Sequence, residues 1–164
     1  MTGIATIAPS GAGLVRCGSG SAQAASTPIL QFLRFRQDLR QDPSVLALQP
    51  TKSALTRLQQ LNDNWDGFGS ARPNVAAIYR AQHMLPELFS AAGGVRGWID
   101  PHVSASEAGE VTFEWWRGDK TITLFFNAAG IDYLRAWGSS MDDEMDDGEL
   151  QDNQFRDLWL WFNS

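Results

Sequence analysis

The stretch EVTFEWWRGDKTITLFFN, residues 110–127, decides the fold class. Apolar side chains alternate with polar ones on both sides of Gly118-Asp119, which is typical of two strands joined by a tight hairpin turn. The same alternation, with short links, indicates neighbouring strands on either side. The sequence therefore predicts a four-stranded antiparallel meander with strands over 97–103, 110–117, 120–127 and 131–137.

Apolar residues recur at helical spacing before Gly94 and again near the end of the chain. This spacing predicts helices over 29–41, 51–61, 73–92 and 148–162, and Pro86 should kink the third of these or end its regular part. The order of elements indicates an α+β fold, with N-terminal helices, the meander, and a C-terminal helix packed on the sheet. Residues 28–164 are predicted to form this single domain.

Residues 1–27 are rich in Gly, Ser and Ala and contain few large apolar side chains. They cannot bury enough surface to offset the entropy of ordering, so we expect a disordered N-terminal segment. A mis-assigned start codon would produce the same kind of segment.

The charge of the chain is concentrated in one place. The net charge is −6 and the sequence pI is about 4.8. Residues 141–152, here called the acidic strip, hold no Lys or Arg and seven acidic residues: Asp142, Asp143, Glu144, Asp146, Asp147, Glu149 and Asp152. The remainder is nearly neutral, at about +1. We expect the strip to be a loop. We also expect no direct binding of nucleic acid, because the phosphate backbone is negatively charged and is bound mainly by basic proteins.

Other features of the composition favour a cytoplasmic protein. Cys17 is the only cysteine, so no internal disulfide can form, and a reducing cytoplasm is the default compartment. Apolar runs are far shorter than the ~20 residues of a spanning helix, so no membrane association is expected.

The segment Asn64-Trp65-Asp66-Gly67-Phe68-Gly69-Ser70 is predicted to form a tight structural turn. We expect Trp65 and Phe68 to plug the junction of helix and sheet, with Trp65 as a buried anchor, while Asp66 caps backbone amides. A cation site is the alternative, but a calcium loop beginning here would have Asn62 in its first position and Pro73 in its twelfth.

Few residues point to catalysis. His83 and His102 are the only histidines, and neither has a Cys or His neighbour at metal-ligand spacing, so no metal and no cofactor are predicted. A Ser-His-Asp triad stays open, although no Gly-x-Ser-x-Gly elbow is present. Glu114 could pair with Asp132 or Asp100 as acid and base, but a solvated sheet face explains these carboxylates more simply.

The turn and its surroundings resemble a group of small bacterial proteins of unassigned function. The resemblance rests on Leu58-x-x-Leu61-x-x-Asn64-Trp65-Asp66-Gly67-Phe68-Gly69-Ser70-x-x-Pro73 and on the later Val111-Thr112-Phe113-Glu114-Trp115, and it covers about residues 55–137. Members of that group often occur on mobile elements or beside toxin–antitoxin loci. The resemblance implies a similar fold and carries over no catalytic residue.

Two functions follow as hypotheses. The first is a non-enzymatic, antitoxin-like inhibitor that binds another protein with a basic surface. Its predicted partner-binding residues are Trp116 and Phe125 on the sheet and five acids of the strip: Asp142, Asp143, Glu144, Asp146 and Asp147. The alternatives without a binding function are that the last helix covers these aromatic side chains and that the strip is a solvated loop. The second is a small hydrolase-like enzyme with a carboxylate site near Asp63 and Asp66. The oligomeric state stays open.

Overall fold

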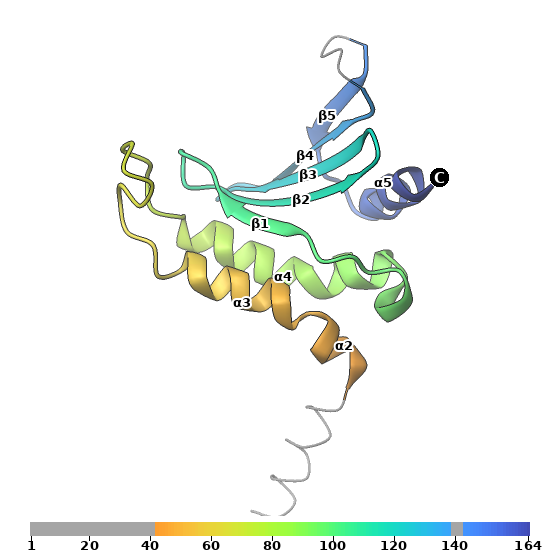
Figure 1. The fold of residues 1–164 in the computed structure, drawn as a ribbon, viewed down its shortest axis with the longest axis horizontal. Helices are drawn as coiled ribbons and strands as arrows, with labels where there is room; N and C mark the ends of the chain where they lie inside the picture. The colour runs from red at the N-terminus through yellow and green to blue at the C-terminus, as the bar shows by residue number, and fades with distance from the viewer. Residues whose placement is uncertain (1–41, 139–142) are drawn as a thin grey trace, which may run out of the picture.

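The computed structural model describes residues 42–138 and 143–164. The disordered segment predicted for 1–27 and the helix predicted for 29–41 lie outside these residues, as does Asp142. The described chain is α+β, with helices, then a sheet, then a last helix (Figure 1). The helices are α2 (Pro43–Ala47), α3 (Gln49–Leu58), α4 (Val75–Ala91), the 3-10 helix η1 (Gly94–Arg96) and α5 (Gln154–Asn163). The strands are β1 (His102–Ala105), β2 (Val111–Arg117), β3 (Lys120–Phe126), β4 (Ile131–Ala136) and β5 (Met145–Glu149).

The sheet is an antiparallel meander of five strands in the order β1-β2-β3-β4-β5, so the prediction of four strands was one short. The additional strand is β5, which lies in the acidic strip and pairs with β4. Our prediction that this strip forms a loop was therefore wrong. Arg135 on β4 donates to the Asp146 carboxylate across the strand pair at 2.9 Å, and such a partner offsets part of the repulsion within the strip.

Other boundaries also differ from those predicted, most of all at the first strand and the last helix. The first strand begins at His102 rather than at residue 97, because the chain first closes the 3-10 turn η1, in which the Gly97 amide donates to the Gly94 carbonyl at 3.1 Å. The last helix begins at Gln154 rather than at residue 148, because Gly148 and Glu149 belong to β5. By contrast, α4 continues through Pro86, whose ring faces solvent.

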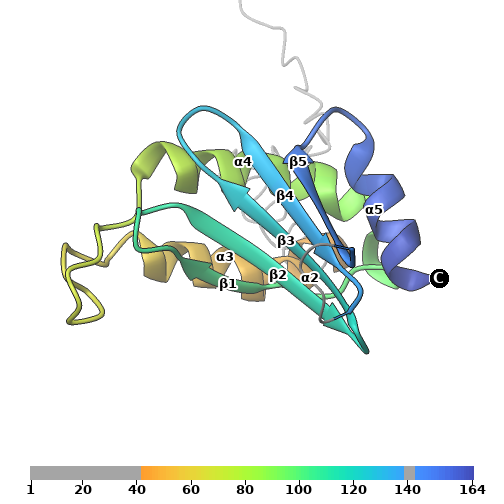
Figure 2. The ribbon, with the colours of Figure 1, turned by 90° about the horizontal axis from the view of Figure 1, so that it is seen from above.

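The helices α3, α4 and α5 all lie on one side of the sheet (Figure 1). Seen from above in Figure 2, the strands lie in front of α3 and α4, and α5 is seen beside β5. The core between the two layers centres on Trp115, which is 1% exposed. Its ring contacts those of Trp98, Phe113, Phe155 and Trp159, so the packing of aromatic side chains joins the sheet to α5. In the part of the chain that the structure describes, every helix is too short or too polar to cross a lipid bilayer.

Candidate functional site

The sheet face opposite the helices, here called the open face, carries the candidate site (Figure 2). Side chains alternate between the faces of a strand, so the large core residues Trp115, Leu124 and Ile131 fix which positions point outward. Thr112 and Thr123 are outward positions by this alternation, although both are buried. The register aligns the outward positions in cross-strand rows. One row holds Ser104, Thr112, Phe125, Asp132 and Glu149, the next holds His102, Glu114, Thr123, Leu134 and Asp147, and the last holds Trp116, Thr121, Ala136 and Met145.

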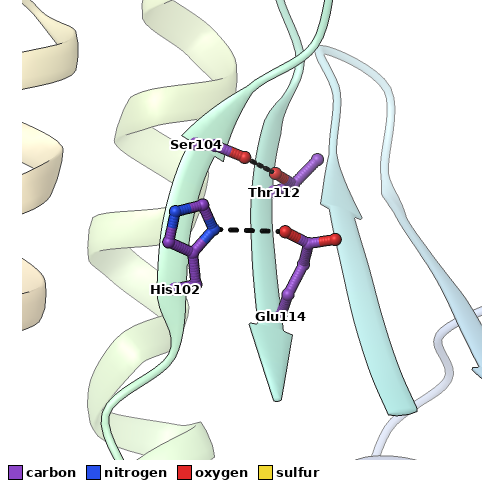
Figure 3. Close-up of polar contacts among 4 residues, drawn as sticks. All are labelled: His102, Ser104, Thr112 and Glu114. Atoms are coloured by element: carbon purple, nitrogen blue, oxygen red, sulfur yellow. Dashed lines mark hydrogen bonds and ion pairs between the residues drawn. The ribbon is translucent and has the colours of Figure 1, made fainter. Parts of the chain in front are cut away.

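Polar contacts join β1 to β2 on this face (Figure 3). The His102 Nδ1 atom lies 3.2 Å from the Glu114 carboxylate, and the hydroxyls of Ser104 and Thr112 are 2.6 Å apart. The His102 ring also contacts the Trp116 ring, with 5.7 Å between centroids. These contacts order the β1 end of the open face.

Large apolar side chains lie in all three rows of the open face. Trp116 is 58% exposed, while Phe125, Leu134 and Met145 are half-buried. The last helix does not cover them, because Phe155 and Trp159 of α5 pack against Trp115 on the opposite face. The alternative that α5 covers Trp116 and Phe125 is therefore wrong. An uncovered set of large apolar side chains on a rigid sheet is typical of a surface that binds a partner.

The charges on the open face are all acidic. Glu114, Asp132, Asp147 and Glu149 point outward from the strands, and the outward positions of β1–β5 include no Lys or Arg. Asp132 and Glu149 were not among the predicted partner-binding residues, and neither were Leu134 and Met145. The alternation along β4 and β5 could have placed them, had residues 145–149 been read as a strand.

The acidic strip is divided between the two faces of the sheet. Asp147 lies on the open face, whereas Asp146 lies on the helix side, where it accepts from Arg135 and from the Tyr133 hydroxyl. Burial, and then the hydrogen bond to Asp146, raise the pKa of Tyr133 above its ordinary value of 10.0. Asp143 is exposed just before β5, and the backbone carbonyl of Glu144 accepts from Trp137 at 3.0 Å. The predicted partner-binding acids thus do not act as one surface.

The turn over residues 64–70 is held by its own polar side chains. Asn64 accepts from the Gly69 amide at 2.7 Å, and Asp66 accepts from the Phe68 amide at 2.9 Å and from the Ser70 hydroxyl at 2.5 Å. The hydrogen bond from Ser70, followed by that from Phe68, holds the pKa of Asp66 below its ordinary value of 3.8. Gly67 and Gly69 have φ values of 81° and 94°, a region that disfavours residues with a Cβ.

This turn does not plug the junction of helix and sheet, as we had predicted. It projects beyond the end of the sheet (Figure 1), with Trp65 38% exposed and Phe68 93% exposed. The Trp65 indole instead lies along the loop and donates to the Ala71 carbonyl at 3.2 Å. The chain reverses at Gly67 and Gly69, so the side chain between them points into water.

The carboxylates considered for catalysis either accept hydrogen bonds within the fold or lie apart from their predicted partner. Asp63 accepts from the Arg72 amide at 3.0 Å, so both Asp63 and Asp66 bind the backbone of their own loop. Asp132 is not opposite Glu114, because the register pairs it with Phe125 and Glu149. Asp100 accepts from Thr51 and from the Trp98 indole. Within residues 42–138 and 143–164, no three His, Cys, Asp or Glu side chains are grouped to hold a metal ion.

Two hollows lie along α4. One, of about 820 Å³, lies between the C-terminal half of α4 and the start of α5, and the other, of about 280 Å³, is lined by Tyr79, Arg80 and His83. Neither hollow is lined by Asp63 or Asp66, so neither provides a pocket for the predicted carboxylate site.

No family model, curated protein or solved structure matches this chain significantly. The resemblance to bacterial proteins that share the turn therefore stays a prediction.

Proposed function

We propose that this chain is a non-enzymatic protein-binding module that uses the open face to bind a basic protein. The observation that carries the proposal is the combination of large uncovered apolar side chains with outward charges of one sign. Trp116 and Phe125 supply the apolar contact, and a tryptophan exposed on a rigid sheet has the properties of an interface hot spot. The surrounding carboxylates supply complementarity to a basic surface.

The charge pattern favours a particular kind of partner. A face that has carboxylates but no Lys or Arg repels acidic surfaces and attracts basic ones, and it accelerates the encounter with a basic partner. Basic grooves on proteins commonly bind nucleic acid. A module of this kind would act as an inhibitor by occupying such a groove, which fits an antitoxin-like factor of a bacterium or phage that neutralises a toxin or defence complex.

The enzymatic alternative gains no support from the geometry near Asp63 and Asp66. A carboxylate that acts as an acid or base has to reach a substrate in a pocket. Both of these carboxylates instead accept hydrogen bonds from backbone amides that shape the turn.

The proposal is tested by removing the charge of the open face and comparing the result with a matched control. The face variant carries Asp132→Asn, Asp147→Asn and Glu149→Gln. The control carries Glu87→Gln, Glu107→Gln and Asp119→Asn, which removes the same charge from exposed positions away from the outward rows. Parent, face variant and control are used to capture proteins from a lysate of the source organism, and captured proteins are purified and retested singly.

A basic protein that binds the parent and the control should associate with the face variant roughly tenfold more slowly at low salt. Trp116→Ala should weaken its equilibrium binding by a hot-spot amount of ~2 kcal/mol or more. Equal binding by all four proteins would show that the open face is not the functional surface. A partner with an acidic surface would also contradict the proposal.

A further inference from the structure

The outer edge of β5 offers a second set of binding groups beside the open face. β5 is the last strand in the sheet order, so no further strand pairs with it in the described part of the chain. In Figure 1 it lies at the end of the sheet away from α3 and α4. The edge of a sheet carries backbone N–H and C=O groups that can pair with an added strand.

The register determines which residues present these groups. The Leu150 amide donates to the Ile131 carbonyl at 2.7 Å, and the Trp137 amide donates to the Glu144 carbonyl at 3.0 Å. In an antiparallel ladder, hydrogen-bonded pairs alternate with pairs whose backbone groups point away from each other. The even-numbered residues of β5, Asp146 and Gly148, therefore pair with β4. The N–H and C=O groups of Met145, Asp147 and Glu149 point toward the outer edge.

The same three residues also place their side chains on the open face. An added strand would thus meet the backbone of Met145, Asp147 and Glu149 and lie beside their side chains. Residues opposite each other on paired strands have their side chains on the same face, and opposite charges there stabilise the pair. The incoming strand would need Lys or Arg at alternate positions, opposite Asp147 and Glu149.

The acidic side chains also argue against a second copy of this chain as the occupant. Two β5 edges brought together would set carboxylates against carboxylates, and charged edges are one way in which proteins avoid edge-to-edge association. A basic strand would be attracted by the same charges. The edge therefore discriminates between self-association and a partner of opposite charge.

We propose that β5 is a strand-addition site for an extended segment of a partner protein in which basic residues alternate with apolar ones. The segment would extend the sheet, and its basic side chains would lie over the margin of the open face. This inference rests on the proposed function, because it names the form in which a basic partner engages the same face.

The test uses the full chain and an N-acetylated, C-amidated nine-residue peptide in which Arg and Val alternate. Binding is measured by calorimetry, and hydrogen exchange of the amides is followed by NMR. The peptide should slow exchange at Met145, Asp147 and Glu149 by about tenfold or more at saturation, since these amides would gain partners. Exchange at Asp146 and Gly148 should change little, because their amides already donate to β4.

Matched peptides separate strand addition from charge attraction. In a strand added antiparallel to β5, the Arg residues that lie opposite Asp147 and Glu149 present their own N–H groups to β5, whereas the Val residues present theirs to the far side. N-methylation of the Arg amides should therefore weaken binding by about tenfold or more, and N-methylation of the Val amides should not. Both modified peptides carry the same charge.

A matched pair of protein variants tests the edge from the other side. Met145→Pro removes an outward N–H without changing the charge, and proline is tolerated at strand edges. Met145→Ala is its control, because it also removes the side chain but keeps the N–H. The proline variant should bind the peptide at least about tenfold more weakly than the alanine variant. If Met145→Pro fails to fold, the peptide series and the exchange measurements still decide the question.

The outcomes separate this inference from the proposed function. Suppose that the face variant no longer binds the peptide, that both N-methylated peptides bind as tightly as the unmodified one, and that Met145→Pro binds like Met145→Ala. The open face then binds basic segments without strand addition. The inference is then overturned and the proposed function stands. It is also overturned if the parent does not bind the peptide, or if sedimentation shows a dimer in which a second copy already protects these edge amides. Failure of the proposed function is decided separately, by the capture experiment.

Discussion

Replacing the two tryptophans Trp115 and Trp65 by alanine should affect stability very differently. Trp115 is 1% exposed, and its indole donates to the Ile99 carbonyl at 2.8 Å. Trp65 is 38% exposed, and its indole donates to the Ala71 carbonyl at 3.2 Å. Each side chain thus makes one hydrogen bond to a backbone carbonyl, and burial is the main difference between them.

The expected magnitudes follow from that difference. Trp115→Ala opens a cavity among four aromatic rings and leaves the Ile99 carbonyl without its donor, so we expect a loss of about 3–5 kcal/mol in the free energy of unfolding. Trp65→Ala removes a solvent-exposed hydrogen bond of about 1 kcal/mol and a partly buried ring, so we expect a loss below about 2 kcal/mol.

The assay is urea unfolding followed by far-UV circular dichroism, because both substitutions remove a fluorophore. Comparable slopes against urea concentration would show that the two variants expose similar surface on unfolding, so their midpoints can be compared. Trp115→Phe keeps most of the ring contacts and should fall between the parent and Trp115→Ala. A Trp65→Ala variant that loses as much stability as Trp115→Ala would refute the reasoning and return Trp65 to the role of a buried anchor.

Phe68→Ser should change the free energy of unfolding by no more than about 0.5 kcal/mol, because the side chain is 93% exposed. A melting temperature that shifts by many degrees would instead show that the ring packs against the fold. The second expectation concerns pH: the pKa of Tyr133 is raised by burial and by its hydrogen bond to Asp146, so the folded chain keeps this proton to a higher pH than the unfolded chain does. The stability that this shift contributes is present below pH 10.0 and is lost as the pH rises toward the folded-state pKa. Urea midpoints measured upward from pH 9 should therefore fall more steeply for the parent than for Tyr133→Phe, and parallel curves would contradict the assignment.

The sequence by itself determined the parts of the fold whose signals are local. The alternation over residues 110–127 and the Gly118-Asp119 turn predict β2, β3 and their hairpin, because both the side-chain period and the turn type are set by neighbouring residues. The same holds for α4, whose buried stripe of Ile78, Ala81, Leu85 and Leu88 repeats at helical spacing. These local patterns are enough to place Trp116 and Phe125 on one face of a sheet.

Only the tertiary structure decided how that face is used. Residues 145–149 have a composition that disfavours strands, and they form β5 because β4 supplies a ladder and because Arg135 lies opposite Asp146. Local sequence cannot report such a partner, which comes from another strand. The burial of Trp115 and Trp65 also depends on residues that are distant in sequence, since the helix layer covers Trp115 but does not reach Trp65. Which face α5 covers, and hence which aromatic side chains stay open to a partner, depends on the packing of the whole domain.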